Sequence, residues 1–395
     1  MKRVFALTIA VIMCLLVVVG CGNGASSGSG DKVVRIGVFE PVTGENGGGG
    51  FQEVMGIRYA NSIRNKVTIG GEEYTVELVE VDNKSDKTEA VSAAQSLVSK
   101  NVSVVLGSYG SGVSIAAGQI FADAQITAIG CSCTNPQVTE GNEYYFRVCF
   151  LDPFQGTVMA SYALDEGYKK AAVITQLGDD YSTGLGNFFE SAFKDLGGEV
   201  VASEQFQTNQ TDFKAILTNI KAQNPDVIFA PSSIATAPLI IKQARELGIE
   251  AVIMAGDTWQ NATIIENAGD YAEGVVCSTF FDEGDTSSAL TTDFVKGFKE
   301  FLKSSDEYLT KNGGEGVASV SALGYDAYNT ALDAIEKAGS LDKVAIKDAM
   351  NALETTGVTG VISFDENGDA KKDMAYIDIV EGGAFKFLKT QTVAK

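Results

Sequence analysis

The sequence predicts an α/β protein with two doubly wound lobes, each built on a parallel sheet. Short runs of β-branched residues alternate with stretches of helical spacing, which is typical of βαβ units. The alternation occurs in two successive blocks, residues 33–129 and 171–255. With 395 residues, the chain is long enough for two domains of about 100–200 residues each.

The first block alternates four strands with three helices. Its opening run, VVRIGVF at 33–39, is rich in valine and isoleucine, which favour strands. The expected strands are 33–39, 73–81, 102–106 and 126–129, and the expected helices are 52–64, 88–99 and 114–124.

The second block repeats this pattern, again with four strands and three helices. The expected strands are 171–175, 199–205, 226–230 and 251–255, and the expected helices are 184–196, 212–222 and 237–247. After it come three helices without strands nearby, at 292–304, 319–338 and 341–352, so we expect them to return and cover the first lobe. The runs 361–364 and 375–380 flank the polar segment DENGD and predict a hairpin that completes the second lobe.

The charge balance and one missing residue type exclude several function classes. There are 51 Asp+Glu against 30 Lys+Arg, and such an acidic surface repels the phosphates of nucleic acids. The chain has no histidine, which removes Ser-His and Cys-His nucleophile pairs and the commonest metal ligand. We therefore expect no nucleic-acid partner, no metal, no cofactor and no enzymatic activity. The alternative is an enzyme that uses a carboxylate, lysine or tyrosine.

The N-terminus predicts export. Lys2 and Arg3 precede an uncharged apolar run, residues 4–19, which is shorter than the roughly 20 residues of a bilayer span and is typical of a signal peptide over 1–20. The run ends in VVVGC, which is similar to the lipobox of bacterial lipoproteins and implies a lipid on Cys21 and a location on the outer side of the cell membrane. A cleaved signal with an incidental cysteine, or an uncleaved anchor, is the alternative.

The segment after Cys21 is rich in glycine and serine, a composition that behaves as flexible coil. We therefore interpret residues 21–32 as a lipidated tether and expect a soluble folded region beyond it. Four further cysteines lie at 131, 133, 149 and 277. They either form a disulfide, as an oxidising location permits, or remain buried free thiols.

Ligands of open parallel sheets bind beyond the carboxyl ends of the strands, so the segments that follow the strands are the candidate site. GSYGSG at 107–112 places Ser111 near a helix start, where an anion such as a carboxylate is favoured; Ser111 as a plain helix cap is equally compatible. GCSCTNP at 130–136 offers backbone groups and the Thr134 hydroxyl, unless it is an ordinary loop.

Two candidates follow strands of the second block. Tyr181 is an aromatic residue that can close over a ligand, or it packs on its own helix. Asp257 can receive an ammonium group through charge-assisted hydrogen bonds, or it is a helix cap or an exposed turn residue.

Several stretches resemble the substrate-binding proteins of branched-chain amino acid ABC transporters, the Leu/Ile/Val-binding family. The resemblance extends over about residues 33–390, in the same order and with similar spacing. It is carried by 105–139 (VLGSYGSGVSIAAGQIFADAQITAIGCSCTNPQVT), DDYSTGLG (179–186), IIKQARELGI (240–249), AGDYAEGV (268–275) and GYDAYNTALDAIEKAG (324–339).

The resemblance implies a type I periplasmic-binding fold, with two lobes joined by a three-strand hinge and the ligand in the cleft between them. It places 33–150 and 281–360 in one lobe, and 151–280 and 361–395 in the other. The α-carboxylate would bind Ser111 and Thr134, with Ser132 and Cys133. The α-ammonium would bind Asp257, and Tyr181 matches the family's pocket tyrosine.

The chain also departs from the family pattern. Gly47–Gly50 occupy a place where the family often has an aromatic residue, and Ser233 and Val320 lie near positions that are aromatic in some members. These departures bear on side-chain specificity rather than on recognition of the amino-acid backbone.

The expected function is that of a lipid-anchored, extracytoplasmic solute-binding protein of an ABC importer. It would bind a branched-chain or other apolar amino acid and present it to the permease subunits in the membrane. The alternatives are an amide- or urea-binding protein and a sensory ligand-binding subunit.

Overall fold

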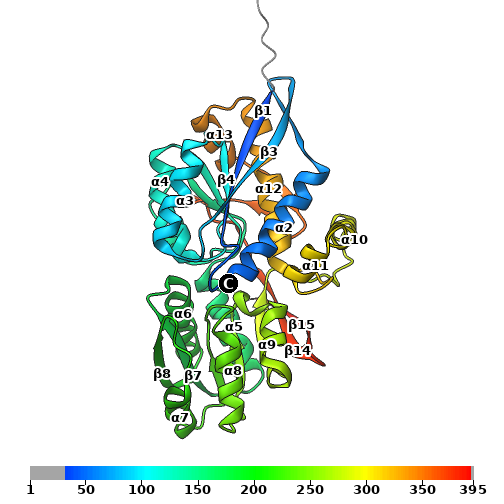
Figure 1. Cartoon of the computed structure of the whole chain (residues 1–395). Coiled ribbons are helices and arrows are strands. Elements are labelled where there is room, and N and C mark those ends of the chain that lie inside the picture. Colours follow the sequence, from blue (N-terminus) through cyan, green and yellow to red (C-terminus); the bar gives the residue numbers. More distant parts are fainter. Residues whose placement is uncertain (1–31, 393–395) are drawn as a thin grey trace, which may run out of the picture. The chain divides into compact units, whose positions relative to one another are not determined.

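The computed structural model describes residues 32–392 and contains two large sheets flanked by helices (Figure 1). We call the elements around the six-stranded sheet the first lobe and those around the seven-stranded sheet the second lobe. The predicted signal peptide and the tether as far as residue 31, Cys21 included, lie outside the described residues. Within residues 32–392, no helix combines the length and the apolar character needed to cross a bilayer.

The first sheet has the order β2-β3-β1-β4-β5-β6. Its strands are β1 (Val33–Glu40), β2 (Lys66–Ile69), β3 (Glu72–Asp82), β4 (Val104–Leu106), β5 (Thr127–Gly130) and β6 (Tyr145–Arg147). Every neighbouring pair is parallel except β2 with β3. The strand order therefore reverses between β1 and β4, which is where open α/β sheets commonly bind ligands.

The second sheet has the order β15-β14-β11-β10-β9-β7-β8. Its strands are β7 (Lys170–Leu177), β8 (Glu199–Gln207), β9 (Val227–Phe229), β10 (Val252–Ala255), β11 (Val276–Thr279), β14 (Met374–Glu381) and β15 (Ala384–Thr392). The order reverses between β7 and β9, and only β14 and β15 run antiparallel to their neighbours. Two doubly wound, largely parallel sheets confirm the predicted fold class. The predicted lobe boundaries themselves stay a prediction.

Each predicted helix is present. Those of the first lobe are α2 (Gly47–Ile63), α3 (Lys87–Ser99) and α4 (Ser111–Asp123), with α12 (Ser319–Ala338) and α13 (Lys343–Asn351) returning from later in the chain. The second lobe has α5 (Asp152–Asp165), α6 (Asp180–Asp195), α7 (Lys214–Ala222), α8 (Ala237–Glu246) and α9 (Ala262–Ala268), and α10 (Ala289–Leu302) and α11 (Asp306–Asn312) follow it.

Helix α2 begins five residues before the predicted start at 52, inside a run of four glycines. Glycine is a poor helix former, but here packing requires it. A Cβ on Gly50 would lie 2.0 Å from the carbonyl oxygen of Pro41, and one on Gly49 would lie 2.4 Å from the Tyr109 ring. Close approach of neighbouring groups therefore overrides the low helix propensity of the segment.

Helix α12 crosses α2 at backbone contact, which confirms that late helices cover the first lobe. A Cβ on Gly56 of α2 would lie 1.9 Å from the carbonyl oxygen of Ser321, and one on Gly324 of α12 would lie 2.4 Å from that of Glu53. Two glycines thus allow the helices to touch where Glu53 enters the interior.

The predicted hairpin between 361–364 and 375–380 is wrong. The first of these runs lies in β13 (Gly360–Ser363), which pairs with β12 (Glu354–Gly357), whereas the second lies in β14 and pairs with β11 and β15. The intervening polar turn is stabilised by local hydrogen bonds, in which Asp365 accepts from the backbone N–H groups of Asn367 and Asp369. A nearer antiparallel partner for each run therefore replaces the predicted pairing.

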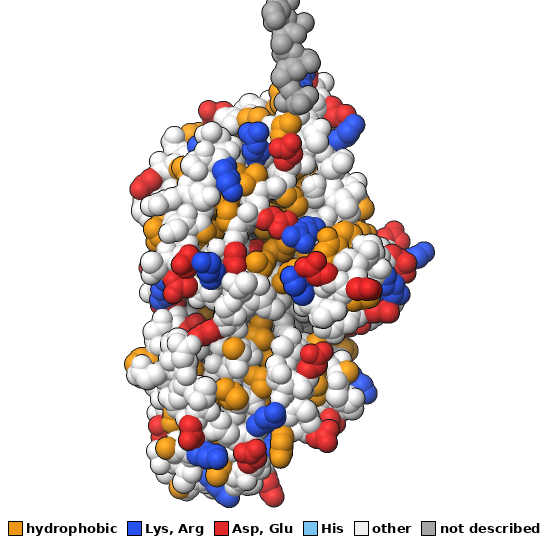
Figure 2. Space-filling model, viewed as in Figure 1, with side chains coloured by type: hydrophobic (Ala, Val, Ile, Leu, Met, Phe, Trp, Pro, Cys, Tyr) orange, Lys and Arg blue, Asp and Glu red, His pale blue; other side chains and the backbone are white. Residues whose placement is uncertain are grey.

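The core consists of two clusters of buried apolar side chains. One lies on the α3–α4 side of the first sheet and includes Phe39, Val105 and Phe121, and the other, larger one includes residues of both lobes. The four cysteines within the described residues are buried as free thiols. Figure 2 shows lysine and arginine side chains interspersed with acidic ones on the visible face, without a continuous basic strip.

Candidate ligand-binding site

Two loops of the first lobe meet where the strand order reverses. Ser111 is the first residue of α4 and is 1% exposed, and its hydroxyl accepts a hydrogen bond of 3.1 Å from the backbone N–H of Asn135. This bond joins the segment after β4 to the segment after β5. Ser111 is not a side-chain cap of its helix, because Gly110 occupies the N-cap position.

The segment after β5 contributes one hydroxyl without a partner. Thr134 is fully buried, and its Oγ1 has no hydrogen-bond partner within the described residues. The Ser132 hydroxyl donates to Glu53 Oε1. The side chain of Cys133 lies in the core cluster on the α3–α4 side, and its carbonyl accepts from Arg147 at 2.8 Å, so Cys133 presents only backbone to the site.

The second lobe contributes a buried carboxylate. Asp257, 3% exposed, accepts hydrogen bonds at Oδ1 from Gln155 Nε2 at 2.7 Å and from the Tyr181 hydroxyl at 3.1 Å. Burial raises the pKa of Asp257 to about 6, and the two hydrogen bonds oppose this shift. Because both partners are neutral, the carboxylate keeps an unbalanced charge that a ligand ammonium can neutralise.

A cavity of about 60 Å³ lies between these walls. Tyr109, Gly110 and Ser111 line it from the first lobe, and Tyr181, Ser233 and Thr258 from the second. The Tyr109 hydroxyl also donates to the carbonyl of Thr258 at 3.4 Å.

The predicted residues therefore come together from both lobes. Ser111 and Tyr181 line the cavity, Asp257 is one hydrogen bond from Tyr181, and Thr134 is one residue from the Asn135 N–H that binds Ser111. Cys133 contributes no side chain to this arrangement.

Further contacts hold the lobes together around the site. Lys87 of α3 forms an ion pair of 2.8 Å with Asp180 of α6, whose carbonyl accepts from Asn135 Nδ2 at 2.8 Å. The backbone N–H of Ile234 donates to Asn46 Oδ1 at 3.1 Å. These contacts join the two lobes beside the cavity, and Asp257 is buried in this arrangement.

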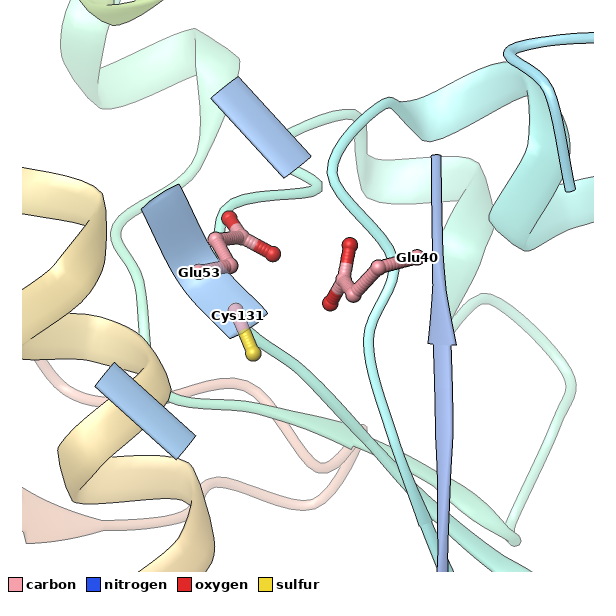
Figure 3. Close-up of side chains that lie close together, drawn as sticks. All are labelled: Glu40, Glu53 and Cys131. Carbon is pink, nitrogen blue, oxygen red and sulfur yellow. The ribbon is translucent and has the colours of Figure 1, made fainter. Parts of the chain in front are cut away.

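Sequence reasoning missed two buried acids, Glu40 and Glu53. Both are 0% exposed, and Figure 3 shows their carboxyl groups facing each other beside the sulfur of Cys131. Glu40 ends β1, so the strand-end rule could have found it. Glu53 lies inside α2 and carries no signal that separates it from an ordinary helical glutamate.

One oxygen of each glutamate and the Cys131 sulfur lie within 4.8 Å of one another, a spacing that a metal ion also requires. Without an ion, burial raises the pKa of the Cys131 thiol well above its usual value and keeps it protonated, whereas metal binding requires the thiolate. The three donors also fall short of the four that a closed metal site uses, so we interpret the group as a protonated acid pair.

The periplasmic binding protein family model matches residues 33–384. The chain belongs to this family. As a periplasmic binding protein it is a solute-binding protein rather than an enzyme, and its family acts outside the cytoplasm, in agreement with the predictions from sequence.

Among solved structures, a leucine binding protein, LivK, from Thermotoga maritima is 36% identical, with a TM-score of 0.83, over 91% of this chain and 99% of that one. LivJ from Streptococcus pneumoniae, solved with isoleucine, is 29% identical with a TM-score of 0.81, over 92% and 99%. Leu/Ile/Val-binding protein homolog 1 of Brucella abortus is 29% identical over 352 residues, 88% of this chain and 90% of that protein. These relatives confirm the resemblance seen in the sequence.

Proposed function

We propose that this periplasmic binding protein delivers a branched-chain or other apolar amino acid to an ABC importer. The observation that carries the proposal is the pairing of two walls: hydroxyl donors on the first lobe and the buried Asp257 carboxylate on the second. Similarity over nearly the whole length to proteins named for leucine, isoleucine and valine supports the same ligand class.

The mechanism is a clamp that recognises a zwitterion. The ligand's carboxylate accepts hydrogen bonds from Ser111 at the start of α4, where the helix dipole favours an anion, and from Thr134 in the segment after β5. Its ammonium group binds Asp257, which Tyr181 and Gln155 orient. Closing the cleft removes water and strengthens both interactions. A ligand favours the closed form only through its higher affinity for that form, which is the form presented to the permease.

The ligand's side chain would face a wall that differs from the family pattern. The Tyr109 ring fills the space beside Gly49, where a Cβ would lie 2.4 Å from ring carbons. An aromatic from the loop after β4 thus replaces the one expected at 47–50. This exchange keeps the wall apolar, which favours an apolar side chain over a charged one.

Calorimetric titration against leucine, isoleucine, valine, alanine, acetamide and urea tests the proposal. We expect saturable one-to-one binding of at least one apolar L-amino acid and none of either amide. Binding of an amide alone would replace the proposed ligand class. Binding without any rescue of amino-acid uptake in a deletion strain would favour a sensory subunit instead.

We propose further that Cys21 is lipidated and anchors the protein to the membrane after removal of residues 1–20. Cys21→Ser is expected to move the protein from the membrane fraction to the extracytoplasmic soluble fraction, because a lipid chain supplies the membrane affinity and no membrane-spanning helix is found within residues 32–392. Immunoblots of both fractions measure the shift. Cys14→Ser, within the apolar run, is the matched control and should leave the protein in the membrane.

A further inference from the structure

Two buried glutamates lie directly behind the wall that would bind the ligand's carboxylate. Glu40 Oε2 accepts the backbone N–H of Tyr109 at 2.6 Å, and Glu53 Oε1 accepts the Ser132 hydroxyl. Each glutamate thus holds one of the two loops that meet at Ser111. The remaining oxygens, Glu40 Oε1 and Glu53 Oε2, receive no donor from the rest of the described chain.

The carboxyl groups face each other in a dry interior (Figure 3). Two ionised carboxylates whose oxygens lie within 4.8 Å of each other repel strongly, and a shared proton relieves the repulsion. The groups that face the pair and influence its charge are Tyr109 after β4, Cys131 and Cys133 after β5, and Asp257 of the second lobe. None of these groups is a cation, so a proton is what can neutralise the negative charge of the pair.

We propose that Glu40 and Glu53 are positioning residues whose protonated pair holds the carboxylate-binding wall, so that ligand binding takes up a proton whenever the free pair has lost one. The inference rests on the proposed amino-acid function. Ionising the pair would place a further negative charge one side chain behind the ligand's carboxylate. The complex therefore favours the protonated pair.

The direction of the pH dependence follows from this linkage. Burial raises the pKa of Glu40 well above its usual value and that of Glu53 to about 7. A bound carboxylate raises them further, so affinity falls as pH increases past about 7, by up to about tenfold per unit. Asp257, with a pKa of about 6, acts oppositely, because its ionised form binds the ammonium and affinity falls as pH decreases below 6. Burial keeps the thiols and Tyr109 neutral throughout.

Calorimetry with L-leucine, L-isoleucine and L-valine at about pH 5.5 to 9, in two buffers of different ionisation enthalpy, measures both affinity and protons taken up. We expect the wild type to take up close to one proton at about pH 8. Glu53→Gln should show no uptake there and a flat affinity above about pH 7, because glutamine still accepts from Ser132 but does not titrate. The variant should still lose affinity at acidic pH, because that loss comes from protonation of Asp257.

Asp326→Asn is the matched control. Asp326 of α12 is another fully buried acid whose pKa is raised by burial, but it accepts hydrogen bonds from the backbone N–H groups of Val358 and Thr359, which do not line the cavity. This variant should keep both the proton uptake and the decline above pH 7. Glu53→Met, which likewise cannot titrate, should abolish the uptake as Glu53→Gln does and provides a second variant should one of them fail to fold.

Three results would overturn the inference while leaving the proposed function intact: amino-acid binding without proton uptake, uptake retained in Glu53→Gln, or uptake lost in Asp326→Asn. Elemental mass spectrometry tests for a metal. A stoichiometric divalent metal in the wild type that Glu53→Gln lacks would show that the pair binds a metal ion rather than a proton. Absence of amino-acid binding at every pH would contradict the proposed function itself.

Discussion

Asp257→Asn is expected to weaken amino-acid binding by about 2–5 kcal/mol, which is the usual effect of removing one partner of a buried charged pair. The change corresponds to a rise in Kd of roughly 30-fold to several thousand-fold. The asparagine keeps the shape of the side chain and can still accept hydrogen bonds from Tyr181 and Gln155. The fold should therefore survive, and the loss should reflect the missing charge opposite the ligand's ammonium. Calorimetric titration at about pH 7 with the tightest-binding amino acid of the panel measures it.

Asp270→Asn serves as the control for this experiment. Asp270 is an exposed residue of the short 3₁₀ helix η3 (Gly269–Ala272) in the same lobe, so the variant removes an equal charge outside the cleft. Its affinity should match the wild type. Unchanged affinity in Asp257→Asn would show that no ammonium binds there and would remove the main support for a zwitterionic ligand.

The second large effect concerns stability. Arg147→Met is expected to lower the free energy of unfolding by about 3–5 kcal/mol, because it leaves the partner of a buried ion pair without its cation. Arg147 is fully buried, and its Nε lies 2.5 Å from Asp369 Oδ1. Its Nη1 donates to the carbonyls of Cys133 at 2.8 Å and Asn135 at 2.6 Å. Urea unfolding followed by circular dichroism measures the change.

Arg58→Met is the matched comparison. Arg58 forms a bidentate ion pair with Glu80, at 2.8 and 2.6 Å, but its side chain is 31% exposed. Solvent screens such a pair, so its removal should cost less than about 1 kcal/mol. Equal losses in the two variants would contradict the assignment of Arg147 as an interior support of the segment that carries Thr134.

The sequence predicts the fold well where the pattern is local. The alternation of strand and helix locates both sheets, because their central strands are short, apolar and buried. The pairing of β13 with β12 and of β14 with β15 depends on which of several nearby strands makes the better partner, and composition does not encode that choice. The early start of α2 at Gly47 likewise depends on Pro41 and Tyr109, which approach it only in the folded chain.

In the candidate site as well, some residues follow from a local sequence pattern and others depend on tertiary packing. Ser111, Thr134 and Asp257 follow strands, so one rule about parallel sheets finds them. Glu53 and Gln155 lie inside helices, and only the packing of α2 and α5 turns them toward the site. Cys133 follows a strand as well, but alternation along the segment directs its side chain into the core.

The late return of α12 and β14 has a consequence for how the protein is made. The first lobe lacks the helix that covers α2 until residue 338 has been synthesised, and the second sheet lacks its edge until residue 392. Such long-range contacts slow folding, so a nascent chain stays without a finished core until translation is nearly complete. If the predicted signal peptide directs export, late completion of both cores favours translocation before the chain has folded.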